Sequence, residues 1–249
     1  MPIIIKSQDE IAIMREAGRI VAQVLEMLVE RLRPGLVEKE LDEIVRRQFA
    51  RRGVVPTFLG YHGYPATVCV SINDEVVHGI PGEREVMDGD LVSIDLGCTH
   101  KGFVADSAVT VGVGNVSPEA RRLVEATREA LWRGIAAARP GARLGDIGAA
   151  IQTFVEAEGF SVVREYVGHG VGRQMHEDPQ VPNYGRPDSG PVLRPGMVLA
   201  LEPMVNVGDW RTNRDSDGWT VRTLDGGLSA HFEHTIAITD GEAEVLTLP

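Results

Sequence analysis

Two aspartates lie on either side of a short turn in residues 93–107. Apolar residues lead into Asp95, glycine and lysine form the turn, and Asp106 lies where a returning strand would begin. Valines then continue at every second position as far as Val113, which is the period of a strand. The pattern predicts a hairpin that brings two carboxylates into apolar surroundings. Because a buried carboxylate is costly without a cation or hydrogen bonds, both aspartates are candidate cation ligands.

Two glutamates and a histidine further along the chain could complete such a site. Glu202 ends an apolar run, Glu233 lies in the last predicted strand, and His169 stands between two glycines. Several ionised carboxylates at close range repel one another unless cations neutralise them. Two divalent ions about 3.5–4 Å apart are the usual solution, and they activate a water and polarise a carbonyl. We therefore predict a dinuclear hydrolase using Co, Mn, Fe or Zn, because this ligand set selects none of them.

Taken singly, each of these residues has an ordinary structural explanation. Asp95 could be a turn residue, and Asp106 could cap the end of a hairpin. Glu202 precedes a proline and could face solvent, as could Glu233 if the period of two turns it outward. His169 could be a hydrogen-bonded core histidine. The choice between a metal site and separate structural roles therefore depends on whether the surrounding helices and strands bring these side chains together.

The order of the elements repeats within the chain. Residues 33–35 (Arg-Pro-Gly) recur at 139–141, and the segment 89–95 resembles 196–202. These matches predict an internal repeat of roughly residues 33–113 and 139–240, within a single catalytic domain that spans residues 1–249.

Two such copies are expected to pack about an approximate two-fold axis. Asp95 would then correspond to Glu202, and Asp106 to Glu233. Four carboxylates would converge from two halves of one sheet, which favours the metal-site interpretation over the separate structural ones.

Helical spacing of apolar residues predicts four helices that support these strands. They cover about residues 9–32, 41–53, 118–138 and 147–159, and Ser7 and Ser117 are their clearest N-caps. Alternating or continuous apolar runs predict strands near residues 68–72, 195–203 and 231–238. The chain is therefore expected to have an α+β fold.

Composition excludes several classes of protein. The 249-residue chain has a net charge of −11, which argues against DNA binding because phosphate contacts need clustered lysine and arginine. The two cysteines, Cys69 and Cys98, form neither a disulfide framework nor a zinc motif, which fits a reducing cytoplasm. Neither a signal peptide nor a membrane span is predicted. We expect a cytoplasmic protein without a membrane partner.

Five motifs together resemble the methionine aminopeptidases of peptidase family M24, in their short bacterial type I form. The motifs are residues 61–65 (Tyr-His-Gly-Tyr-Pro), 78–81 (His-Gly-Ile-Pro), 168–177 (Gly-His-Gly-Val-Gly to Met-His-Glu), 201–203 (Leu-Glu-Pro) and 232–235 (Phe-Glu-His-Thr). The resemblance implies the pita-bread fold, with two halves related by a pseudo-two-fold axis and helices packed on a curved antiparallel sheet. It also implies removal of the initiator methionine from nascent proteins when the second residue is small.

The resemblance also implies a role for each candidate residue. The metal ligands would be five residues, two of which, Asp106 and Glu233, would bridge both ions: Asp95, Asp106, His169, Glu202 and Glu233. A water or hydroxide bridging the metals would attack the scissile carbonyl, with Glu202 moving the proton. His78 and His176 would contact the substrate beside the scissile amide. The pocket for methionine would be lined by six residues: Phe58, Tyr61, Tyr64, Cys69, Met175 and Trp219.

Three positions depart from the pattern of the relatives. Phe58 stands where some of them have a small cysteine, and Met175 where many have phenylalanine, so the shape of the pocket is open. His231 is unusual before the Phe-Glu pair and has no explanation in the sequence. With His62, His100 and His234 it is assigned to the surface or to packing.

Two rival functions remain at this point. A proline-specific or dipeptide hydrolase of the same fold usually carries an additional N-terminal domain, whereas 94 residues precede Asp95 here. A non-catalytic binding protein on this fold would lack metal ligands, whereas all five are present. The expected partners are peptides with N-terminal methionine, with the ribosome as a further candidate, and the protein is expected to be a monomer.

Overall fold

The fold is organised around a nine-stranded antiparallel sheet in the computed structural model, which describes residues 2–249. The main path through this sheet is β1-β4-β5-β14-β9-β7-β8, with β2 paired to β4 and β15 paired to β14. The strands of this sheet are β1 (Val55–Pro56), β2 (Cys69–Ile72), β4 (Leu91–His100), β5 (Phe103–Gly112), β7 (Gly168–Gly170), β8 (Glu177–Val181), β9 (Val198–Leu201), β14 (Glu233–Ala237) and β15 (Glu244–Val245). The hairpin predicted around Asp95 and Asp106 is the pair β4–β5.

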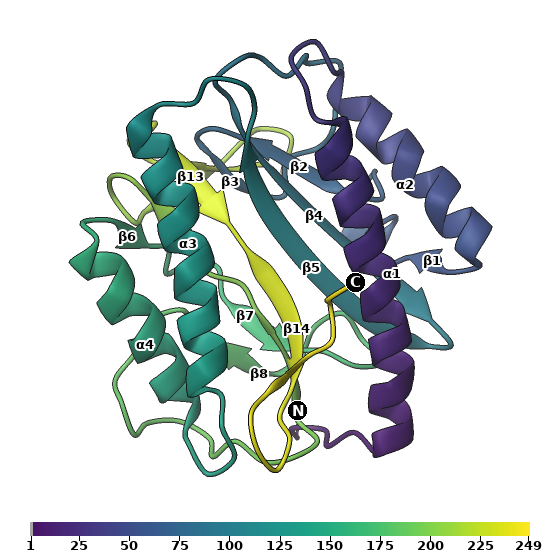
Figure 1. Cartoon of the computed structure of the whole chain (residues 1–249), viewed down its shortest axis with the longest axis vertical. Helices are drawn as coiled ribbons and strands as arrows, with labels where there is room; N and C mark the ends of the chain where they lie inside the picture. Colours follow the sequence, from purple (N-terminus) through teal and green to yellow (C-terminus); the bar gives the residue numbers. More distant parts are fainter. Residues whose placement is uncertain (1) are drawn as a thin grey trace.

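Four helices cover one face of this sheet (Figure 1). They are α1 (Gln8–Arg31), α2 (Glu38–Arg52), α3 (Pro118–Ala137) and α4 (Leu144–Ala157). Ser7 begins α1 through a capping box, in which its side chain accepts from the Glu10 backbone N–H and its own N–H donates to the Glu10 carboxylate. The Ser117 hydroxyl accepts from the Ala120 N–H at 3.1 Å and begins α3. All four predicted helices and the α+β class are therefore confirmed.

Each half of the sheet has its own apolar core. One core lies between α1, α2 and the strands β2, β4 and β5, and includes Leu41, Phe49 and Ile94. The other lies beneath α3 and α4 and includes Leu123 and Ile147. Figure 1 shows α1 and α2 on one side of β5 and β14, and α3 and α4 on the other. The internal repeat itself, with its boundaries, stays a prediction.

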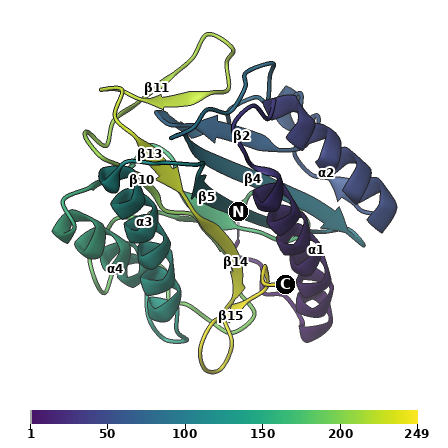
Figure 2. The same ribbon diagram turned by 45° about the horizontal axis from the view of Figure 1, so that its top comes forward.

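Two smaller antiparallel sheets flank the main one. Their orders are β13-β10-β6 and β11-β12-β3, and β11 lies at the upper edge in Figure 2. The strands are β3 (Glu75–Val77), β6 (Ser161–Val162), β10 (Met204–Asn206), β11 (Thr212–Arg214), β12 (Val221–Thr223) and β13 (Ser229–His231), and a 3-10 turn, η1, covers Tyr61–Gly63.

The strand predicted over residues 231–238 is interrupted at Phe232. The segment before it, β13, pairs with β10, whereas β14 after it pairs with β5 and β9. At the crossing point the Phe232 N–H donates to the Pro203 carbonyl at 3.3 Å. An apolar run shows that a strand exists but not which neighbours it pairs with, so this change of sheet was not predictable. Among residues 2–249, no helix is long and apolar enough to cross a membrane.

Candidate metal centre

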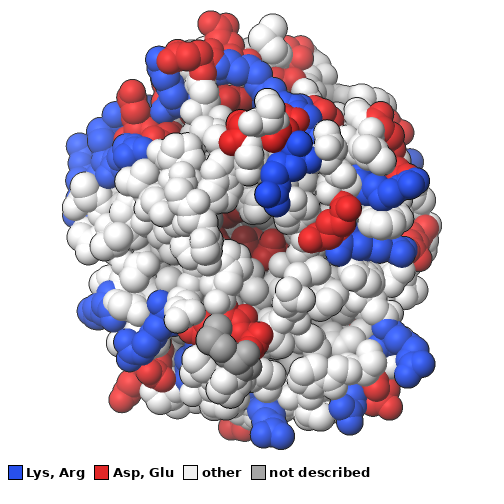
Figure 3. Space-filling model, turned by 180° about the vertical axis from the view of Figure 1, so that it is seen from behind, with Lys and Arg blue, Asp and Glu red and all other residues white. Residues whose placement is uncertain are grey.

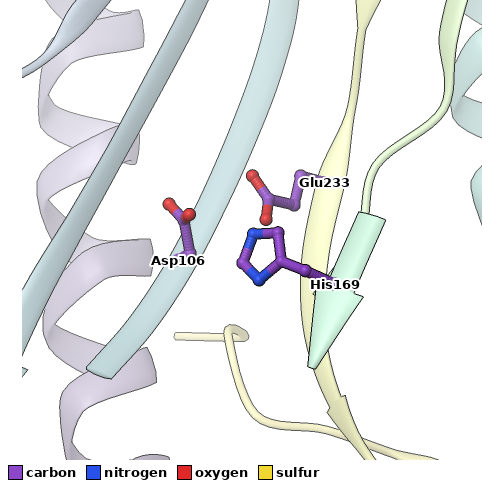
Figure 4. A group of neighbouring side chains, drawn as sticks. All are labelled: Asp106, His169 and Glu233. Carbon is purple, nitrogen blue, oxygen red and sulfur yellow. The ribbon is translucent and has the colours of Figure 1, made fainter. Parts of the chain in front are cut away.

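Asp106, His169 and Glu233 form the centre of a group of buried ligands. Figure 4 shows their side chains pointing toward one another from β5, β7 and β14. One ligand atom from each lies within 4.8 Å of the other two, and all three residues are buried. The chain thus brings together residues separated by up to 127 positions, as the sequence interpretation requires.

Asp95 and Glu202 border the same group. Asp95 lies in β4, next to β5, and Glu202 follows directly after β9, next to β14. One carboxylate oxygen of Glu202, Oε1, is 3.5 Å from Nε2 of His169. Both carboxylates line one cavity of about 380 Å³ together with the three central ligands. All five predicted metal ligands therefore face one space.

Three of the four carboxylates each have an oxygen without a hydrogen-bond partner in the described part of the chain. Asp95 Oδ1, Asp106 Oδ1 and Glu233 Oε1 are buried and, within residues 2–249, accept no hydrogen bond. Burial, followed by repulsion from its acidic neighbours, raises the pKa of Asp95 and likewise that of Glu233. Burial raises the pKa of Asp106 to about 7, although hydrogen bonds with Asp95 and the Ser107 backbone act in the opposite direction. Orphaned carboxylate oxygens around one imidazole are what divalent cations would satisfy, so these residues fit a metal site.

Glycines on both sides of His169 are required by the packing of β7. A Cβ at Gly168 would lie 2.3 Å from the Ala200 carbonyl oxygen, and one at Gly170 would lie 2.3 Å from that of Asp178. Strand β7 is therefore confined between β9 and β8, which fixes the direction of the His169 ring. Its Nδ1 is 3.0 Å from the Gly170 carbonyl oxygen, which only accepts. Nδ1 thus donates, and Nε2 offers its lone pair toward the carboxylates.

His176 lies against both His169 and Tyr61. The ring centroids of His169 and His176 are 4.2 Å apart, and the Tyr61 hydroxyl is 2.7 Å from His176 Nδ1. His78 also lines the cavity and contacts the rings of Trp219 and Tyr166 edge to face. Burial lowers the pKa of His78 to about 4 and also lowers that of His176. Both imidazoles are therefore neutral at pH 7.

The remaining wall of the cavity is largely apolar. Phe58, Tyr64, Cys69 and Met175 are buried there. The Tyr64 hydroxyl donates to a backbone carbonyl and lies 2.8 Å from the Gly79 oxygen, so its ring is fixed. Thirteen predicted site residues line this cavity: Phe58, Tyr61, Tyr64, Cys69, His78, Asp95, Asp106, His169, Met175, His176, Glu202, Trp219 and Glu233. Their individual roles stay predictions.

The cavity opens on the side of the molecule away from the helices. Figure 3 shows acidic atoms at the bottom of a hollow in the middle of that face, with mostly uncharged residues around it. A ligand can therefore reach the buried carboxylates from this face of the molecule.

Two histidines near the site had been predicted from the sequence to be surface or packing residues. His62 lines the cavity and stacks edge to face on Tyr61, with ring centroids 4.4 Å apart. The sequence signal that His62 lies near the site was its position inside the Tyr-His-Gly-Tyr-Pro motif. His231 is buried, with Nε2 lying 3.9 Å from Glu202 Oε2. Only its position two residues before Glu233 pointed to it.

Comparison with known proteins agrees with this arrangement. A model described as metallopeptidase family M24 matches residues 12–240. Methionine aminopeptidase 1 of Bacillus subtilis is 54% identical over 245 residues, covering 98% of this chain and 99% of the relative. Methionine aminopeptidase of Escherichia coli K12 is 48% identical over 250 residues, covering 100% and 95%.

Solved structures of similar proteins have the same fold. The crystal structure of methionine aminopeptidase from Thermotoga maritima superposes with a TM-score of 0.98 at 48% identity, with all of both chains covered. Prolidase from Pyrococcus furiosus gives a TM-score of 0.80 at 25% identity and covers 99% of this chain but 66% of its own. The predicted pita-bread fold is confirmed by these likenesses.

Proposed function

The chain belongs to metallopeptidase family M24, and we propose that it removes the initiator methionine from nascent proteins whose second residue is small. The observation that carries this proposal is its similarity, along almost its whole length, to enzymes named methionine aminopeptidase. The five ligands around one cavity support a metal-dependent hydrolase, whereas a non-catalytic relative is expected to have lost ligands.

We propose that Asp95, Asp106, His169, Glu202 and Glu233 would hold two divalent cations, and that Asp106 and Glu233 would each contribute to both. The unpartnered oxygens of Asp95, Asp106 and Glu233 support this assignment. When bound, such a pair of cations lowers the pKa of a water molecule and polarises the scissile carbonyl. The identity of the metals is left open, because Co, Mn, Fe and Zn all suit this ligand set.

Glu202 is proposed to move the proton. Burial raises the pKa of its carboxyl well above the ordinary value, so the group can hold a proton during turnover. It would accept that proton from the attacking water and pass it to the nitrogen of the leaving peptide.

His176 and His78 are proposed to hold the scissile amide. If the Tyr61 hydroxyl donates to His176 Nδ1, the imidazole proton is on Nε2 and is free to donate to the carbonyl oxygen as negative charge develops there. His78 lines the same cavity as a neutral, half-buried imidazole and would donate to the amide of the substrate.

The apolar wall is the proposed pocket for the methionine side chain. Phe58, Tyr64, Cys69, Met175 and Trp219 offer aromatic rings, a thiol and a thioether, and sulfur makes favourable contacts with aromatic rings. Such a wall also excludes water from the reacting groups.

The test is hydrolysis of a Met-Ala-Ser peptide by protein loaded with Mn²⁺ or Co²⁺. We expect release of free methionine, its loss after treatment with a chelator and its return with either ion. A Met-Leu peptide should be a poor substrate. Turnover that survives the chelator would contradict the metal mechanism. Efficient cleavage of X-Pro peptides without methionine would instead favour the rival hydrolase, whose fold is also similar.

We also propose that the protein works as a monomer in a reducing cytoplasm on newly made chains. Two free, buried cysteines support that compartment. The ribosome stays a candidate partner, without any residue assigned to docking.

A further inference from the structure

His231 is a buried polar residue that the proposed reaction does not use. It is the last residue of β13 and only 1% exposed. One side chain holds its backbone through two hydrogen bonds. The Thr110 hydroxyl donates to the His231 carbonyl at 2.7 Å and accepts from the His231 N–H at 2.8 Å. The position of the imidazole is therefore set by the sheet.

The side chain of His231 points at Glu202. Its Nε2 is buried and has no hydrogen-bond partner within the described chain, and Oε2 of Glu202 is 3.9 Å away. The other oxygen, Oε1, lies 3.5 Å from His169 Nε2. The Glu202 carboxylate thus lies between two imidazoles, one a proposed metal ligand and the other without an assigned role.

A neutral imidazole has one N–H, so His231 can donate a hydrogen bond without adding charge to the site. A buried N–H without an acceptor is costly, and Glu202 Oε2 is the nearby acceptor. A hydrogen bond needs about 3 Å, so a small rotation of either side chain is sufficient.

We propose that His231 is a positioning residue for Glu202: its Nε2–H donates to Oε2 and holds the carboxylate so that Oε1 faces the ligand cluster. The inference rests on the proposed function, in which Glu202 is both a metal ligand and the proton carrier. Groups that orient a metal ligand typically change metal affinity or activity 10–100-fold when they are removed.

The test compares His231→Leu, which cannot donate, with His231→Gln, which can. Calorimetric titration of metal-free protein with Mn²⁺ alone should show about 10–100-fold weaker binding for His231→Leu and near wild-type binding for His231→Gln. With the Met-Ala-Ser peptide, kcat should fall by a similar factor in His231→Leu while KM stays within about twofold. Retained Mn²⁺ affinity and kcat in His231→Leu would overturn the proposal.

Two controls separate positioning from packing. His234→Gln alters a half-buried imidazole, which faces Trp132 and Thr247 on the helix side, and it should leave Mn²⁺ affinity unchanged. In a Glu202→Gln background, His231→Leu should weaken Mn²⁺ binding no further, because the two residues act together. Equal losses in His231→Leu and His231→Gln would show a packing role and reject the proposal.

The experiments stay informative if a His231 variant does not fold or if the proposed function is wrong. If His231→Leu does not fold, His231→Phe replaces it and is compared with His231→Gln in the same way. The Mn²⁺ titration needs no substrate, so it tests the inference even if wild-type protein does not cleave Met-Ala-Ser. That inactivity would reject the proposed function alone.

Discussion

A single hydrogen bond determines what His176 can do. The Tyr61 hydroxyl lies 2.7 Å from its Nδ1, and the two rings stack with centroids 5.4 Å apart. Since burial lowers the pKa of His176, the ring enters the reaction neutral, and its tautomer decides whether it donates or accepts. The same imidazole in water would be free to exchange between both tautomers.

Replacing His176 with alanine should therefore lower kcat by roughly 10²-fold or more, as loss of one oxyanion donor does. KM and Mn²⁺ affinity should change much less, because His176 is not a proposed ligand. Steady-state kinetics and an Mn²⁺ titration on the same preparation check this. Tyr61→Phe is the matched variant: it keeps the ring stack but removes the hydroxyl, and it should have an intermediate kcat. A normal kcat in His176→Ala would remove this residue from the mechanism.

The sequence indicated which residues could be metal ligands better than it indicated which residues surround those ligands. Asp95, Asp106 and Glu202 were predicted as ligands because the internal repeat would place them, with Glu233, at equivalent strand positions. His231 was not, because a histidine within a strand is compatible with packing and nothing local shows what its ring faces. Its neighbour Glu202 is 29 positions away in the sequence, and only the fold brings them together.

At the scale of elements, the loop that carries His176 is fixed by a distant part of the chain. The Lys6 ammonium donates to Glu177 Oε2 at 2.7 Å, and both side chains are almost fully buried. The other oxygen of Glu177 accepts from the Gln174 N–H at 3.2 Å. The N-terminal segment thus supports the turn between β7 and β8, directly beside His176. No periodicity in the sequence indicates such a pair, because it joins residues 171 positions apart.

Breaking this buried pair should be costly. Lys6→Met leaves the Glu177 carboxylate buried without a cation, which typically costs about 3–5 kcal/mol. Urea unfolding monitored by circular dichroism measures the loss, and kcat should fall as the loop loses its support. The double variant Lys6→Met/Glu177→Gln should recover part of the stability. Lys39→Met breaks the exposed pair with Glu83 and should leave the unfolding midpoint unchanged. Equal effects of both lysine variants would contradict this interpretation.

The helices were the easiest elements to predict, and the short strands the hardest. Capping residues and a 3.6-residue period are local signals, so the helix after Ser7 was predicted to within a residue or two at each end. Strands β10 to β13 are three residues each, and their pairing depends on neighbours that sequence patterns do not identify. For the same reason the interruption at Phe232 was missed.

At the scale of the whole molecule, the ligands lie on or next to strands from both halves of the main sheet, where the two halves meet. Strands β4 and β5 pair continuously from Leu91↔Gly112 to His100↔Phe103, whereas β5 and β14 pair at Glu233↔Ala108 and His234↔Ser107. The Thr235 hydroxyl adds to that short junction by donating to the Asp106 carbonyl at 2.8 Å. Cations shared by Asp106 and Glu233 would therefore connect the two halves of the sheet.

Removing the metals should loosen this junction more than the rest of the protein. Without cations, the buried carboxylates of Asp106 and Glu233 repel across the short β5–β14 pairing, while the β4–β5 hairpin keeps its own ladder. Hydrogen exchange read by mass spectrometry should therefore speed up about tenfold or more in peptides from β14 after chelation. Peptides from α1 and α2 should change little. Glu233→Gln, which lacks one charge and one ligand, should exchange at a rate that Mn²⁺ hardly alters. A uniform increase along the chain would mean that the cations stabilise the fold as a whole rather than this junction.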